Sequence, residues 1–339
     1  MNKQIELNHV GPIENLKIPI PEGEQPVNSF VVMDDQPTPE PPRDGSSWDE
    51  YCQVRAMNGS TLVHGLTSML HLKHSIDNPK EQTPAMMLGT VTHLLLLEPE
   101  EFENRFVVMP DYQNDEANRT KPKKKDEEGK QTTSKATAYY KSKARQFFED
   151  ARSEGKEVVR REEYDKSLAM IEAVRGNKCA SMWLDDPNSR KEVTVVGEIE
   201  GVVFKGRIDI LHPSSLTDIK TSRIMNPFQF GKFAYGAGYL FKQAIHRELV
   251  YQMTGEKVPV RYTVVENDPP YDCAVYEFER DDEEIFDQEL KRVCKLIRKY
   301  KECIKNDVWP GVDGGDDYVR FPIPDYAMEV ESISGWGGE

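Results

Sequence analysis

The 339-residue sequence lacks any long apolar stretch, and its apolar runs, such as Leu94–Leu97, reach only four residues. A helix that crosses a bilayer needs about 20 apolar residues, so the sequence excludes an integral membrane protein. The N-terminus lacks the apolar segment of a secretory signal, and the five cysteines form no C-x-x-C pair. We therefore expect a cytoplasmic protein with no membrane partner and no cysteine-held zinc or iron–sulfur site.

The sequence also lacks an excess of basic residues, because 59 Asp and Glu outnumber 44 Lys and Arg. A protein that binds phosphates usually presents a basic surface, so the net charge of −15 argues at first against a nucleic-acid partner. The acids concentrate at the ends, however: residues 1–45 carry −5 and residues 306–339 carry −7, which leaves −3 for residues 46–305. A nearly neutral body can still carry a local basic lining.

The composition divides the chain into three parts. Residues 1–45 hold eight of the 22 prolines and few apolar side chains, which indicates an extended acidic arm. We expect residues 46–305 to form one folded domain and residues 306–339 to form an acidic tail. Within the domain, the polar residues 111–135 predict a loop.

The apolar periodicity predicts an α/β domain with helices packed on a central mixed sheet. The helix-like segments before residue 190 are expected to begin at Ser47 and at Ser60, and to cover 84–97, 135–153 and 161–175. A period of two then predicts a three-stranded meander over 193–199, 202–211 and 216–220. The remaining expected elements are helices at 226–236, 238–253 and 281–304 and strands at 259–266 and 272–279.

Two acids and a lysine fall on neighbouring strands of this meander. Asp209 lies near the end of one strand, and Asp218 and Lys220 share a face of the next. Converging carboxylates repel each other, which favours a bound divalent cation or a raised pKa on one acid. Oxygen ligands select Mg2+ or Mn2+. The alternative is a surface ion pair of Asp209 and Lys220 beside a turn Asp, but the apolar residues that flank the trio favour a functional site.

This pattern resembles the core of the PD-(D/E)xK nucleases. Gly206–Asp209 and Asp218–Lys220 are similar to the signature of an Asp on one strand followed by an acid-x-Lys on the next. Leu88–His93 resembles the G-x-x-x-H helix of the RecB-type and RecE-type branch, in which the His is a metal ligand. Without this resemblance, a lone His on a helix lined by Leu and Met would indicate a core histidine. The likeness to RecE-like and phage alkaline exonucleases runs over about residues 46–305.

The resemblance implies a restriction-endonuclease-like fold and metal-assisted phosphodiester hydrolysis. In such a site, one or two Mg2+ or Mn2+ ions would be held by His93, Asp209, Asp218 and the Ile219 carbonyl. Lys220 would orient the attacking water or offset charge in the transition state.

One family motif is displaced in this sequence. RecE-like enzymes carry Q-x-x-x-Y on the helix after the sheet, whereas ungapped continuation sets Lys242 and His246 at those positions. Gln243 lies one residue away, and we expect it to be the catalytic-site glutamine because its amide can both donate and accept hydrogen bonds.

Enzymes of this branch resect linear duplex DNA from 5′ ends as closed rings and leave a 3′ single strand. The resemblance therefore implies double-stranded DNA ends as substrate, a homo-oligomeric ring (trimer or tetramer) and a single-strand annealing protein of the RecT/Beta type as partner. By position, Arg55, Ser60 and Arg223 resemble the pocket for the 5′-phosphate. Arg119 and Lys121 begin a basic loop that could contact DNA. The alternatives to these DNA contacts are that Ser60 only caps a helix and that the basic residues are only solvated.

Two other functions are compatible with the same core. A structure-specific endonuclease would use identical residues, so the sequence does not separate it from an exonuclease. A non-catalytic DNA- or partner-binding protein is the other alternative, but the intact trio Asp209, Asp218 and Lys220 disfavours a decayed enzyme.

Overall fold

The structure is a computed structural model that describes residues 47–79, 83–118, 137–278, 284–314 and 318–322. The expected N-terminal arm, the basic loop around Lys121 and most of the acidic tail lie outside these ranges. None of the helices within them combines the length and the apolar character needed to cross a bilayer.

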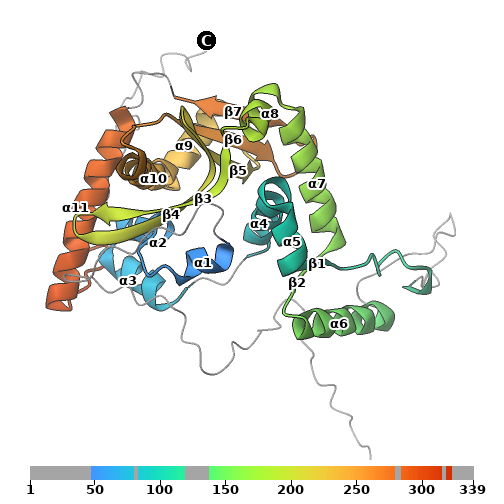
Figure 1. The fold of residues 1–339 in the computed structure, drawn as a ribbon. Coiled ribbons are helices and arrows are strands. Elements are labelled where there is room, and N and C mark those ends of the chain that lie inside the picture. Colours follow the sequence, from blue (N-terminus) through green and yellow to red (C-terminus); the bar gives the residue numbers. More distant parts are fainter. Residues whose placement is uncertain (1–46, 80–82, 119–136, 279–283, 315–317, 323–339) are drawn as a thin grey trace, which may run out of the picture.

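A five-stranded mixed sheet runs through the centre of the fold in the order β3-β4-β5-β6-β7 (Figure 1). Neighbouring strands pair antiparallel except for β5 and β6, which are parallel. The predicted meander, the two later strands and the α/β class are thus confirmed. The strands are β3 (Arg190–Ile199), β4 (Val202–His212), β5 (Ser215–Ser222), β6 (Val260–Glu266) and β7 (Cys273–Glu277).

Helices cover both faces of this sheet, and alternate strand residues supply the two cores. Leu216 and Val264 belong to the larger core with α9, α10 and α11, whereas Ile219 and Val265 belong to a second core with α4, α7 and α8. The helices named here are α4 (Pro84–Leu97), α7 (Arg161–Gly176), α8 (Lys178–Asp185), α9 (Pro227–Gly236), α10 (Tyr239–Thr254) and α11 (Glu284–Asn306).

The N-terminal helices follow their capping residues. Ser47 and Glu50 form a capping box that begins α1 (Trp48–Gln53), as predicted. The expectation of one continuous helix from Ser60 is wrong, because Ser68 accepts a hydrogen bond from the His71 amide and begins a new helix. The segment is therefore divided into α2 (Gly59–Leu62), a 3-10 turn η2 (Val63–Leu66) and α3 (Met69–Asp77).

Helix α4 begins as predicted, since the Thr83 hydroxyl accepts from the Met86 amide at 3.2 Å and Pro84 occupies the first helical position. Several short elements next to it were not predicted, because their patterns are too brief to show a period. These are α5 (Pro99–Arg105), β1 (Phe106–Val108), the 3-10 turn η3 (Glu116–Asn118) and β2 (Glu157–Val159), which pairs parallel to β1; the predicted α6 (Ala138–Ser153) precedes β2.

Candidate active site

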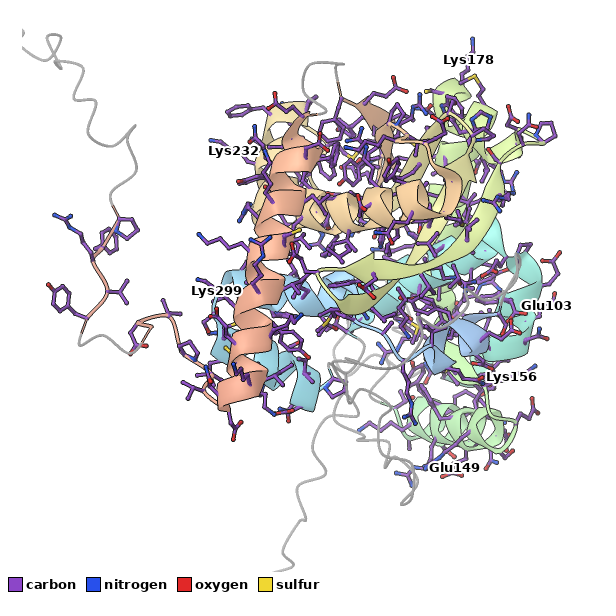
Figure 2. All side chains as sticks on the ribbon, turned by 60° about the vertical axis from the view of Figure 1, so that its left-hand side comes forward. Glu103, Glu149, Lys156, Lys178, Lys232 and Lys299 are labelled. Carbon is purple, nitrogen blue, oxygen red and sulfur yellow. The ribbon has the colours of Figure 1, made fainter. Side chains whose placement is uncertain are left out.

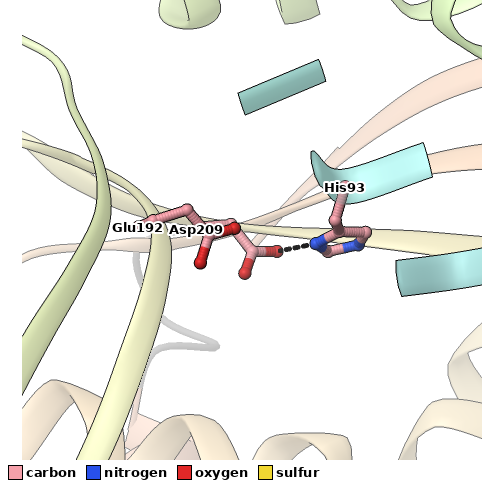
Figure 3. A group of neighbouring side chains, drawn as sticks. All are labelled: His93, Glu192 and Asp209. Atoms are coloured by element: carbon pink, nitrogen blue, oxygen red, sulfur yellow. Dashed lines mark ion pairs between the residues drawn. The ribbon is translucent and has the colours of Figure 1, made fainter. Parts of the chain in front are cut away.

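Three side chains from three elements converge where α4 meets the sheet. Figure 3 shows His93 of α4, Glu192 of β3 and Asp209 of β4 pointing toward one another. One potential ligand atom from each residue lies within 4.8 Å of the others. An imidazole and two carboxylates at these distances are suited to a divalent cation.

The hydrogen bonding of His93 fits a cation at this place. Its Nε2 lies 3.0 Å from the carbonyl oxygen of Ile219. A carbonyl can only accept, so Nε2 donates; in a neutral imidazole the other nitrogen, Nδ1, then presents a lone pair. That Nδ1 lies 3.6 Å from Asp209 Oδ2, which is also an acceptor. Two acceptors that face each other are stabilised when a metal ion or a proton lies between them.

Glu192 is the member of this group that the sequence pattern did not predict. The antiparallel register of β3 and β4 places it opposite Asp209. Its backbone φ of 51° lies in the left-handed region, which is uncommon for residues other than glycine. The turn at Glu200–Gly201 sets the register of the two strands, so counting back from that turn would have paired Glu192 with Asp209.

The electrostatics of the two carboxylates reflect their burial. Burial, followed by the nearby charge of Asp209, raises the pKa of Glu192 to about 7. Burial also raises the pKa of Asp209 above its ordinary value, against the opposing effect of His93. Both acids therefore hold protons more tightly than exposed acids do, and a bound cation would displace those protons.

Arg207 anchors Glu192 beside Asp209. Its Nε donates to Glu192 Oε2 at 2.5 Å, and its Nη2 donates to the two carboxylate oxygens of Glu98 at 2.9 and 2.8 Å. The Arg207 side chain is only 8% exposed. Arg207 is therefore covered by acids from β3 and from the junction of α4 with α5.

The structure brings Asp209 together with the Asp218–Lys220 segment. Asp209 Oδ2 accepts a hydrogen bond from the Ile219 amide at 2.6 Å. The Lys220 ammonium forms an ion pair with Asp218 and lies 3.3 Å from the Ile219 carbonyl oxygen. Burial alone would lower the pKa of Lys220, but the Asp218 and Asp209 carboxylates raise it above its ordinary value, so the ammonium is charged. The Ile219 carbonyl, predicted to contact metal, accepts from Lys220 and His93 in this structure.

A cavity of about 210 Å³ opens beside Asp218 and Lys220. Gln243 Oε1 is buried there and has no hydrogen-bond donor among the described residues. Burial lowers the pKa of His246 to about 4, and burial together with the charge of Lys220 lowers the pKa of Lys242. The cavity is lined by Tyr51, Asn58, Gly59, Ser60, Lys205, Arg207, Asp218, Lys220, Tyr239, Lys242, Gln243 and His246.

The residues predicted to bind DNA lie at different places. Ser60 lines the cavity, but Arg55 and Arg223 are not among its lining residues. Arg223 is 78% exposed, and its Nε lies 3.2 Å from Asp268 Oδ2. Arg119 and Lys121 lie outside the described residues, so their predicted contact with DNA stays a prediction. Within the described ranges, the basic side chains of the cavity come from β4, β5 and α10 instead.

One wall of the cavity is fixed by a buried lysine. The Lys205 ammonium donates to the carbonyl oxygens of Tyr51, Cys52 and Val54 at 2.8, 3.4 and 2.9 Å. It also lies 4.5 Å from the centroid of the Tyr51 ring. Lys205 therefore ties the end of α1 to the sheet.

The fold and the site together define a class of protein. The Asp209 strand is followed by the Asp218–Lys220 strand, and the helix that carries His93 packs against both, which is the arrangement of a PD-(D/E)xK-like domain. A family described as "PDDEXK-like domain of unknown function (DUF3799)" matches residues 66–322, and the chain belongs to this family.

Similarity to individual proteins is distant. A crystal structure from Eubacterium rectale, described as a "Putative exonuclease", is 13% identical with a TM-score of 0.48. The match covers 82% of this chain and 94% of that chain. No curated protein matches the sequence.

Proposed function

We propose that this chain is a metal-dependent exodeoxyribonuclease that degrades linear double-stranded DNA in the 5′-to-3′ direction and leaves 3′ single strands for annealing. The observation that carries the proposal is the acceptor-lined group of His93, Glu192 and Asp209 beside the charged Lys220. Membership of the PDDEXK-like family supports a nuclease core. The exonuclease mode and its direction rest on the resemblance of the His93 helix and the Asp218–Lys220 segment to RecE-like enzymes.

The residues of the site suit the steps of phosphodiester hydrolysis. His93, Glu192 and Asp209 would hold Mg2+ or Mn2+, with Asp218 on the next strand as a further oxygen ligand. A divalent cation supplies Lewis acidity and lowers the pKa of a bound water. The Lys220 ammonium offsets negative charge on the phosphate, and the Gln243 carbonyl oxygen accepts a hydrogen bond from the attacking water.

The cavity beside Lys220 suits a terminal phosphate. Lys242 and Lys220 supply positive charge, and the Ser60 hydroxyl supplies a hydrogen bond. The lowered pKa of Lys242 shows that burial disfavours its charge, and a bound anion would restore it. We therefore assign recognition of the 5′-phosphate to Ser60 and Lys242, in place of the predicted Arg223.

The proposal includes two kinds of protein partner: further copies of this chain and an annealing protein. The chain would assemble as a homo-oligomeric ring of three or four copies, and the single strand that it produces would pass to an annealing protein of the RecT/Beta type. Light scattering on the full chain tests the ring, because a trimer or tetramer of a 38.9 kDa chain has three or four times that mass. A monomeric mass at the concentration used for hydrolysis would contradict it.

The test of the function compares linear with covalently closed circular duplex DNA, each with Mg2+ and with EDTA. We expect that only the linear form is degraded, and only with Mg2+. Nucleotides should be released first from 5′-labelled ends. Cleavage of the closed circle would identify an endonuclease. Degradation in EDTA would contradict the metal dependence, and inert linear DNA would identify a non-catalytic binder.

A further inference from the structure

Helix α9 presents an aromatic surface to solvent. Phe228, Lys232 and Tyr235 are spaced i, i+4 and i+7 and so share one side of the helix, while Phe230 is buried on the opposite side. Phe228 is 72% exposed and Tyr235 is 52% exposed. We refer to Phe228, Lys232 and Tyr235 as the α9 platform. Exposed aromatic side chains grouped in this way mark interaction surfaces.

Cations lie against the rings of the platform. The Lys232 ammonium is 4.6 Å from the centroid of the Phe228 ring. The Arg292 guanidinium, from α11, is 5.7 Å from the Tyr235 ring, and its Nη1 lies 3.2 Å from the Tyr235 hydroxyl. Figure 2 shows Lys232 at the outer surface, on the same side of the molecule as Lys299 of α11.

The charge around the platform indicates an anionic partner. From Ile219 to Arg247 the sequence contains five Lys and Arg and no Asp or Glu, although the whole chain carries 59 acids. Arg292 does pair with Glu289, but that carboxylate is only 3% exposed. A partner that approaches α9 therefore meets rings and cations without exposed acids from this segment. An apolar partner surface would have to desolvate these cations, whereas a polyanion pairs with them.

Helix α9 also contacts a residue of the cavity wall through Phe233, which is not part of the platform. The Phe233 ring of α9 lies 5.7 Å from the Tyr239 ring in an edge-to-face contact. Tyr239 lines the cavity, and the Lys220 ammonium lies 5.5 Å from its centroid. The platform therefore belongs to a helix that contacts the wall of the cavity.

We propose that the α9 platform binds single-stranded DNA, with bases stacked on Phe228 and Tyr235 and phosphates at Lys232 and Arg292. Unstacked bases and a phosphate chain match alternating rings and cations, whereas the bases of a duplex are already stacked on each other. The inference deepens the proposed exonuclease function, on which the choice of DNA rests, but binding to the platform requires no hydrolysis.

The experiment measures binding of a fluorescent oligothymidine to the full chain in EDTA by anisotropy. The double substitution Phe228→Ala/Tyr235→Ala should weaken binding at least about tenfold, since each stacked base contributes substantially to affinity. Lys232→Glu should weaken binding and reduce its dependence on salt. The matched control is Phe148→Ala on α6, because Phe148 is 41% exposed and α6 lies on the opposite side of the molecule from α9 (Figure 1). This control should bind as the unmodified protein does.

Three results would overturn the inference: unmodified protein that does not bind the oligonucleotide, platform variants that bind normally, or platform variants that lose only their oligomeric state. The last result would identify the surface as a contact between copies of the chain. Hydrolysis of linear duplex is measured in parallel. If the unmodified protein is inactive but its binding still depends on the platform, the proposed function is contradicted and this inference stands. If the protein is active and the platform variants bind normally, the proposed function stands and this inference is contradicted.

Discussion

Replacement of Glu192 tests whether this unexpected acid belongs to the metal site. Its pKa of about 7 means that, at pH 6, roughly one molecule in ten carries the charged carboxylate, and at pH 8 about nine in ten. A cation binds the deprotonated form, so affinity should rise with pH. Glu192 alone should contribute about a tenfold increase in Mn2+ affinity between pH 6 and pH 8.

The assay is calorimetric titration of the metal-free protein with Mn2+ at several pH values. Glu192→Gln should weaken binding at pH 8 and reduce the rise in affinity across this range by up to about tenfold. Glu98→Gln is the matched control, because Glu98 also pairs with Arg207 but is outside the ligand group. Identical pH dependence in Glu192→Gln and in the unmodified protein would refute the assignment of Glu192 as a ligand.

Further predictions concern the walls of the cavity. Lys205→Met should lower the free energy of unfolding by about 2 kcal/mol in urea denaturation, because three carbonyls lose a charged donor; unchanged stability would argue against this role. Gly206→Ala places a Cβ 2.7 Å from His246 Cδ2. This substitution should therefore lower the free energy of unfolding by about 1–3 kcal/mol, and unchanged stability would mean that α10 shifts freely. Lys242→Ala should abolish a preference for 5′-phosphorylated over 5′-hydroxyl duplex ends in rate assays, whereas Arg223→Ala should keep it; the reverse pattern would restore Arg223 to the pocket.

Much of the fold could be predicted from the sequence, because in most elements the local turn and capping signals agree with the pattern of buried apolar residues. Alternating apolar residues and the Glu200–Gly201 turn define the β3–β4 hairpin, and Thr83–Pro84 defines the start of α4. The interruption of the helix at Ser68 was not predicted, because the helical spacing of apolar residues continues across this position. Ser68 ends the preceding turn only by acting as the N-cap of the next helix.

The site was predictable where its residues are close in sequence or match a motif. Asp209, Asp218 and Lys220 lie on consecutive strands, so their proximity follows from the meander. Glu192 was predictable only through the register set by the Glu200–Gly201 turn, because no local signal in the sequence indicates its left-handed backbone.

The burial of Lys205 and Arg207 could not be predicted from their strand. Their partners come from α1, β3 and the junction of α4 with α5, so the contacts depend on how distant segments pack. The same holds for Arg223, whose position after Lys220 in sequence does not bring it to the cavity.

Metal-dependent hydrolysis at Asp209 is tested most directly by the single-turnover rate of nucleotide release from a 5′-phosphorylated linear duplex by Asp209→Ala with saturating Mg2+. We predict a loss of about 100-fold or more, with an unchanged circular dichroism spectrum, because a metal ligand next to the reacting phosphate is removed. Asp268→Ala, which removes an exposed carboxylate that pairs with Arg223, should react at the normal rate. A folded Asp209→Ala protein with full activity would contradict the role of Asp209 as a ligand of the catalytic metal.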